Sequence, residues 1–82
     1  MTPTEEKIIA ILLDNGLTRE TSIHERSRLA EDLNMDSLDT LELSMSIEEE
    51  FDIELPEELM GTVSTVADVA KMVDERVYSP KQ

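Results

Sequence analysis

Three stretches of this chain repeat their apolar residues with the spacing of an α-helix, and no other feature constrains the fold as strongly. Ile8, Ile11 and Leu12 share one face of the stretch 4–15. A longer stripe near the C-terminus has the same spacing and consists of Val66, Val69, Ala70, Val73 and Val77. Adjacent apolar residues in this second stripe, such as Val69 and Ala70, break the period-2 alternation of a half-buried strand. The third stretch spans 36–51, and together the three predict an all-α fold.

Residues at the ends of these stretches match known signals for helix starts and stops. Thr4 is the expected N-cap of the first helix, and Gly16, suited to the left-handed conformation, is its expected stop. Asp36 is the expected N-cap of the middle helix. Thr65 and Asp68 resemble a capping box at the start of the last helix.

The connections complete the expected fold. Pro56, at N1, is predicted to open one short helical turn that Gly61 ends. The stretch 16–35 has no periodicity, and a loop that long in a compact domain is usually functional. Four of its apolar residues are expected to pin it across the bundle: Leu17, Ile23, Leu29 and Leu33. The prediction is a small four-helix bundle of three longer helices, one short helix and a long first loop. It forms a single domain over 1–82, with a frayed end from 78 onward.

The middle helix carries two apolar stripes, although one is enough to face a core. One consists of Leu43, Ile47 and Phe51, with few acids beside it. The other consists of Leu38, Leu41 and Met45, flanked on both sides by Glu42, Glu48 and Glu49. We expect the first stripe to face the core and the second to lie near the surface, as an apolar patch in an acidic rim typical of docking surfaces. The alternative is a helix between two neighbours with both stripes buried.

The charge is strongly acidic and unevenly distributed. Asp and Glu number 20 against 7 Lys and Arg, for a net charge of −13, and no Lys or Arg occurs from Leu29 to Ala70. Such a polyanion repels nucleic acid and anionic membranes, so basic protein surfaces are the expected partners. A charged run is usually a solvated face, but here it coincides with the two-striped helix.

Residue types and segments that the sequence lacks exclude several classes of protein. The chain has no cysteine, which excludes disulfides, zinc–thiolate sites and a Cys nucleophile and favours a reduced, cytoplasmic setting. No apolar run approaches the ~20 residues of a membrane span. The N-terminus lacks the basic region of a signal peptide. The chain has only two aromatic residues, Phe51 and Tyr78, so it offers few side chains on which nucleic-acid bases could stack.

One partial metal motif is present but incomplete. Asp32, Asn34 and Asp36 match the first three ligand positions of an EF-hand loop. Ser37 and Leu43 then stand where that loop needs Gly and a bidentate Glu. No metal site is therefore expected.

Catalytic constellations are also incomplete. His24 is the only histidine, and no G-x-S-x-G turn is present to pair with it in a triad. Gly16 and Gly61 are the only glycines, so there is no glycine-rich phosphate loop. A helical bundle of this size also leaves little room for a closed, dry pocket. We expect no enzymatic activity.

The central part of the chain resembles a known family. Residues 29–43 read LAEDLNMDSLDTLEL and residues 47–56 read IEEEFDIELP. Both closely resemble the acyl carrier proteins of fatty acid and polyketide synthesis, and the resemblance extends over essentially the whole chain. In that family the motif serine carries a 4′-phosphopantetheine arm through a phosphodiester. That residue is Ser37 here, between Asp36 and Leu38. A phosphate is favoured at a helix start, where N–H groups are unpaired and the dipole is positive.

The resemblance also implies how such a carrier works. A phosphopantetheinyl transferase transfers the arm from coenzyme A to Ser37, and the arm then carries acyl groups as thioesters. A monomeric carrier is implied, which is a substrate for acyl-transferring and chain-elongating enzymes with basic docking patches. The residues implied to meet those partners are Asp36, Leu38, Asp39, Leu41, Glu42, Met45, Glu48 and Glu49.

Some residues depart from the family pattern. Asn34 stands where the family usually has Gly, and Asn tolerates the left-handed conformation that such a turn requires. Ser44 and Ser46 replace residues that are often apolar, which leaves open whether the core shelters an acyl chain. Two alternatives remain: a D-alanyl or other specialised carrier, and an unmodified acidic interaction module that uses Leu38 and Met45. The pathway and the acyl group are not indicated.

Overall fold

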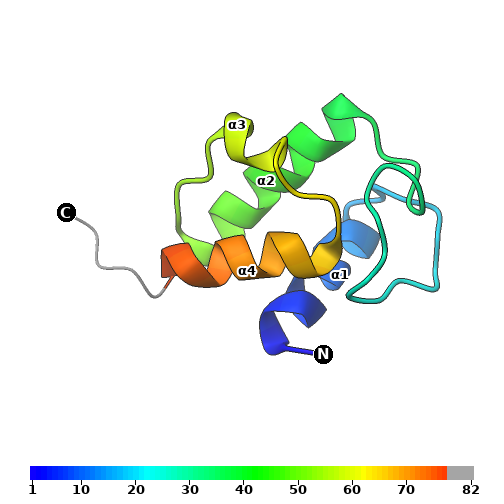
Figure 1. The fold of residues 1–82 in the computed structure, drawn as a ribbon, viewed down its shortest axis with the longest axis horizontal. Coiled ribbons are helices and arrows are strands. Elements are labelled where there is room, and N and C mark those ends of the chain that lie inside the picture. The colour runs from blue at the N-terminus through cyan, green and yellow to red at the C-terminus, as the bar shows by residue number, and fades with distance from the viewer. Residues whose placement is uncertain (78–82) are drawn as a thin grey trace.

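A computed structural model describes residues 1–77, and these residues fold into a bundle of helices (Figure 1). The elements in chain order are α1 (Pro3–Asp14), α2 (Ser37–Phe51), α3 (Glu57–Met60) and α4 (Val66–Val77). Three longer helices, one short helix and a long first loop confirm the predicted fold class. The predicted fraying of 78–82 lies outside the described residues.

The first helix begins earlier than the sequence reading expected. The Thr2 hydroxyl accepts the Glu5 N–H at 3.1 Å, and the Glu5 carboxylate accepts the Thr2 N–H at 2.8 Å. This capping box places Pro3 at N1, where its missing N–H needs no partner. The predicted N-cap at Thr4 is wrong, because Thr4 lies in the first turn and its hydroxyl donates to the Asp74 carboxylate of α4 at 2.5 Å.

The other helix ends largely follow their sequence signals. Gly16 adopts a φ of 64°, the left-handed conformation expected where α1 stops. Thr65 and Asp68 form the predicted capping box, with N–H to oxygen distances of 3.1 Å in both directions. Pro56 is the N-cap of α3 rather than N1, one residue off the prediction. Val77 is 41 % exposed and not part of the core, because it ends α4 beyond the last buried residue, Val73.

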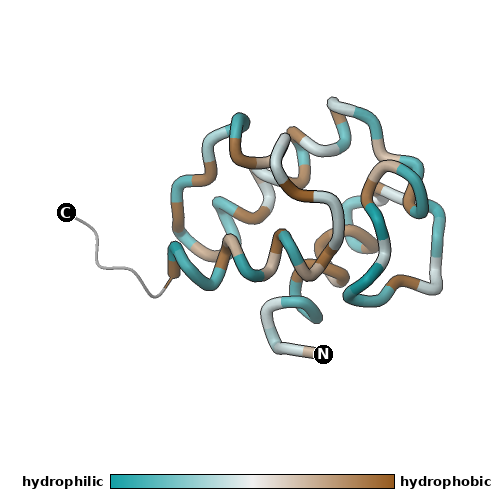
Figure 2. The backbone as a smooth tube through the Cα atoms, viewed as in Figure 1, coloured by the Kyte–Doolittle hydropathy of each residue, from teal (hydrophilic) through white to brown (hydrophobic). Residues whose placement is uncertain are grey.

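A single aliphatic core joins the four helices to the long loop. Within the described residues, α1 packs against α4 and α2, and α3 packs against α2. Figure 2 shows hydrophobic (brown) segments alternating with hydrophilic (teal) ones along the chain. The buried helix residues are Ile8, Ile11, Leu12, Leu43, Ile47, Met60, Val66, Val69, Ala70 and Val73. The loop and connectors add Leu17, Leu29, Leu33, Met35, Ile53 and Leu55, while Ile23 packs on the core half-buried. The predicted pinning of the loop is confirmed.

The two stripes of α2 separate as predicted. Leu43 and Ile47 have no exposed surface, and Phe51 is half-buried with the Lys7 ammonium 5.7 Å from its ring centre. On the other stripe, Leu38 is 72 % and Met45 56 % exposed, whereas Leu41 is half-buried. The alternative with both stripes buried is therefore wrong.

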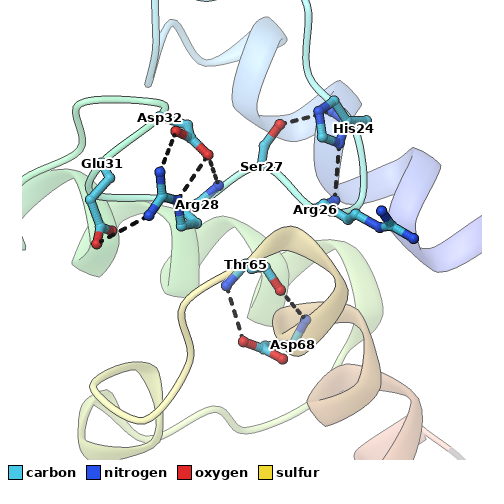
Figure 3. Close-up of polar contacts among 8 residues, drawn as sticks. All are labelled: His24, Arg26, Ser27, Arg28, Glu31, Asp32, Thr65 and Asp68. Atoms are coloured by element: carbon cyan, nitrogen blue, oxygen red, sulfur yellow. Dashed lines mark hydrogen bonds and ion pairs between the residues drawn. The ribbon is translucent and has the colours of Figure 1, made fainter.

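The long loop is held by backbone pairing with the start of α4. The Leu29 N–H donates to Ser64 O at 2.8 Å. In return, the Val66 N–H donates to Ser27 O at 3.1 Å, and the next amide of α4 donates to Glu25 O at 2.9 Å. Figure 3 shows this part of the loop passing next to the Thr65–Asp68 capping box. The loop thus supplies acceptors for two of the N–H groups that a helix start leaves unpaired.

Candidate functional site

Two aspartates define the start of α2. The Asp36 carboxylate accepts the Asp39 N–H at 2.9 Å, and the Asp39 carboxylate accepts the Asp36 N–H at 3.1 Å. The Asp36 carbonyl also accepts both the N–H and the hydroxyl of Thr40, each at 3.0 Å. These bonds fix Asp36 as the N-cap in an extended conformation, so Ser37 becomes the first residue of the helix, with its side chain exposed.

The capping bonds also set the ionisation of the N-cap. The Asp39 backbone N–H, which Asp36 accepts, is the largest cause that holds the pKa of Asp36 below its usual range. Asp36 is therefore ionised at neutral pH. Its carboxylate is occupied by this bond, so it starts the helix at Ser37.

The turn that leads into this cap is fixed from both sides. Asn34 has a φ of 56°, the left-handed conformation expected for it. After it, the Met35 N–H donates to Leu29 O at 3.0 Å, and the Met35 side chain is buried. Before it, the Thr18 hydroxyl donates to Leu33 O at 3.0 Å. The start of α2 therefore lies at a set place relative to the core.

An ion-pair cluster braces the loop just upstream (Figure 3). The Arg28 guanidinium makes two bonds of 3.2 Å to the Asp32 carboxylate, and its backbone N–H adds a third at 2.9 Å. Glu31 lies 3.8 Å from the same guanidinium. The Arg28 side-chain bond holds the pKa of Asp32 below its usual range. Asp32, a residue of the incomplete EF-hand match, is thus engaged with Arg28.

No group of metal-ligating side chains forms among residues 1–77. Within these residues, no three His, Asp or Glu side chains are placed to hold an ion. His24, the other residue weighed for chemistry, is exposed, and its Nδ1 accepts the Arg26 N–H at 3.1 Å (Figure 3). None of the helices described is both long and apolar enough to cross a membrane.

The residues expected to meet partners fall into two groups on α2. Leu38, Glu42, Met45 and Glu49 are exposed and form what we call the open face. Asp36 and Asp39 are occupied by their capping bonds, and Leu41 is half-buried. Glu48 is half-buried too, and its carboxylate accepts the Leu55 N–H at 2.8 Å. The sequence reading missed that bond, because no local pattern links two residues seven apart across a helix end.

An open groove of about 400 Å³ also borders the start of α2. Its lining includes Asp39, Asn34 and the charged residues Arg19 and Glu20, so it is largely polar and open to solvent. Residues two apart on an α-helix point in directions about 200° apart. Asp39 and Ser37 therefore point to different sides of α2, and Ser37 is not among the residues that line the groove.

Comparison with known proteins identifies the family. The family described as the phosphopantetheine attachment site matches residues 6–73. An acyl carrier protein of Rickettsia bellii (strain RML369-C) is 41 % identical over 71 residues, which cover 87 % of this chain and 83 % of that protein. The crystal structure of an acyl carrier protein from Thermotoga maritima has the same fold, with a TM-score of 0.76 over 92 % of both chains at 24 % identity. The chain therefore belongs to the acyl carrier protein family, whose domain is the attachment site of phosphopantetheine.

Proposed function

We propose that Ser37 is the residue that carries 4′-phosphopantetheine. The supporting observation is its position: an exposed side chain on the first residue of a 15-residue helix. A phosphodiester there lies at the positive end of the helix dipole. When attached, the arm supplies the thiol on which acyl groups are held as thioesters, since the chain has no cysteine. The enzymes served are those of fatty acid or polyketide-type synthesis.

Three other serines support this choice by contrast. Ser27 is 3 % and Ser44 2 % exposed, so neither hydroxyl is open to a modifying enzyme. The Ser44 hydroxyl also donates to Leu41 O at 2.7 Å. Ser64 is exposed but precedes the cap of α4 instead of starting the helix. Ser37 combines exposure, a helix start and the family motif.

Intact-mass measurement after incubation with coenzyme A and a broad-specificity phosphopantetheinyl transferase tests the assignment. The unaltered chain should gain one phosphopantetheine. Ser37→Ala should gain none while remaining folded, because N1 is an exposed position that tolerates Ala. Ser64→Ala is the matched control and should be modified fully. Modification of Ser37→Ala would show that another residue carries the arm.

We propose further that partner enzymes dock on the open face of α2. Leu38 and Met45 offer exposed apolar surface, and Glu42 and Glu49 offer carboxylates with no hydrogen bond or ion pair among the described residues. A basic patch with an apolar pocket complements this combination. Exposed ion pairs contribute only about 0–1 kcal/mol each, so the charges act mainly on encounter rate and orientation.

Binding kinetics with the transferase test the docking face. Glu42→Lys should slow association and weaken its dependence on salt, and Met45→Ala should speed dissociation. Glu6→Lys makes the same charge change on α1 and should leave both rates nearly unchanged. An equal effect of Glu6→Lys and Glu42→Lys would mean that net charge, and not this face, governs docking.

The chain, as we propose it, is one carrier domain that acts as a substrate and not as a catalyst. The single core and the match over 6–73 support one domain. The absence of cysteine supports a cytoplasmic setting. A D-alanyl carrier would differ in the group loaded on the arm. An unmodified interaction module would bind partners through Leu38 and Met45 and would gain no mass in the transferase assay.

A further inference from the structure

The connector between α2 and α3 is tied to one residue of α2. The helix ends at Asp52, in the left-handed conformation at φ 55°. The N–H groups of Asp52 and Ile53 both donate to the Glu48 carbonyl, the second at 3.2 Å. Two residues later, the Leu55 N–H donates to the Glu48 carboxylate at 2.8 Å. Glu48 thus holds the connector with both its backbone and its side chain.

The position of α3 depends on this connector. The helix has four residues and no side-chain cap, and so short a helix is not stable by itself. The Leu59 N–H closes its turn on Pro56 O at 3.0 Å. Beyond that turn, α3 is held by the buried Met60 and by Leu55, which is 2 % exposed. Leu55 stays buried only while the connector keeps its path.

The Glu48 carboxylate holds the backbone of the connector, whereas those of Glu42 and Glu49 do not. Glu42 and Glu49 are exposed and point to solvent, whereas Glu48 is half-buried with its carboxylate on a backbone N–H. A buried N–H that loses its acceptor costs more than an exposed ion pair contributes. The contacts between α1 and α4 do not involve this bond.

We propose that the Glu48 carboxylate is a latch that keeps the connector and α3 closed against α2. Opening the latch frees α3 while the rest of the bundle stays packed. Glu48 is then a positioning residue inside the carrier, distinct from the carboxylates of the open face. The inference goes beyond the proposed function, because the latch operates in the unmodified chain and does not depend on Ser37.

Backbone amide hydrogen exchange, followed residue by residue by NMR on the unmodified full chain, tests the latch. Glu48→Ala should speed exchange of the Leu55 amide at least about tenfold, because a hydrogen bond to a charged acceptor is lost. The Leu59 amide should also exchange faster. Val73 of α4 should keep its rate. Glu48→Gln still offers an amide oxygen as acceptor, so it should keep the Leu55 rate within about threefold of the unaltered chain.

Glu49→Ala is the matched control and should leave the Leu55 rate unchanged. Equal acceleration at Leu55 and Val73 in Glu48→Ala would overturn the proposal, since it means general destabilisation. So would a Glu48→Gln variant as fast as Glu48→Ala. The unaltered chain offers a second test that no folding defect can obscure: a scalar coupling across the hydrogen bond between the Leu55 amide nitrogen and the Glu48 carboxylate carbon. Absence of that coupling also overturns the latch.

Discussion

The starts of α2 and α4 use the same local chemistry and end up in opposite environments. Each is closed by a carboxylate at the third helical position, Asp39 in α2 and Asp68 in α4. The long first loop passes over the start of α4, where the Val66 N–H donates a hydrogen bond to Ser27 O. In α2 no acceptor among the described residues takes the Ser37 N–H.

This difference determines whether a helix start can attract a phosphate group. The positive end of a dipole attracts a phosphate only where its N–H groups are not already taken. The first helical residue of α4, Val66, is fully buried, whereas Ser37 is exposed. Both starts have a capping box, but only that of α2 is open at the first helical residue, where we propose that the covalent group is attached.

The largest effect that tests this contrast is on stability. Val66→Ala removes two buried carbons beneath the loop and should cost about 2 kcal/mol of unfolding free energy. Leu38→Ala, one residue further along the other helix and 72 % exposed, should change it by less than about 0.5 kcal/mol. Urea denaturation of both variants measures the two values. Similar losses would mean that the start of α2 is covered as well.

A smaller effect is expected at the turn into α2. Asn34 has a φ of 56°, which an Ala side chain adopts at a cost of about 1 kcal/mol. Asn34→Gly should change the unfolding free energy by less than about 0.5 kcal/mol, because glycine enters this region freely. The same denaturation experiment compares the two. If Asn34→Ala were as stable as Asn34→Gly, the turn before α2 would not be fixed by local backbone conformation.

The smallest expected effect is the loss of stability when the capping carboxylates Asp36 and Asp68 are protonated at acid pH. This loss should be similar for the two helix starts. The pKa values of Asp36 and Asp68 are both held below the usual range by backbone N–H groups. A lowered folded-state pKa means that the stabilisation is present above the unfolded-state value of about 4 and is lost as the pH falls through the folded-state value. The stability difference between the unaltered chain and Asp36→Asn should therefore shrink as the pH falls below about 4.

Melting temperatures measured across that range check this expectation. Asp68→Asn is the comparison for α4, and its difference from the unaltered chain should shrink over the same range. A difference that grows at low pH for either variant would contradict the sign derived from these pKa shifts.

Much of the fold was predictable because its signals are local. The cap at Asp36, the capping box at Thr65 and the left-handed residues Gly16 and Asn34 each depend on a few neighbouring residues. The first helix shows the limit of such reading. Thr2, followed by proline and by Glu5 at the third position, is a complete start signal that the choice of Thr4 overlooked.

Other features have no local signal. The burial of Ser44 depends on how α2 lies against its neighbours, and the exposure of Val77 depends on where the core ends along α4. The bond from Leu55 to Glu48 crosses a helix end. Apolar periodicity identifies which face of a helix is buried, but it does not identify where along the helix the packing stops.

By itself, the sequence determined the three long helices, the buried stripe of α2 and the placing of Ser37 at a helix start, because hydrogen bonds and side-chain spacing within a few residues decide these. Only the tertiary structure decided that the loop closes the start of α4 and leaves that of α2 open. The pairs responsible, Leu29 with Ser64 and Ser27 with Val66, lie far apart in the chain and are joined through backbone atoms. Backbone groups are the same in nearly every residue, so no pattern of side chains reveals which of them will meet.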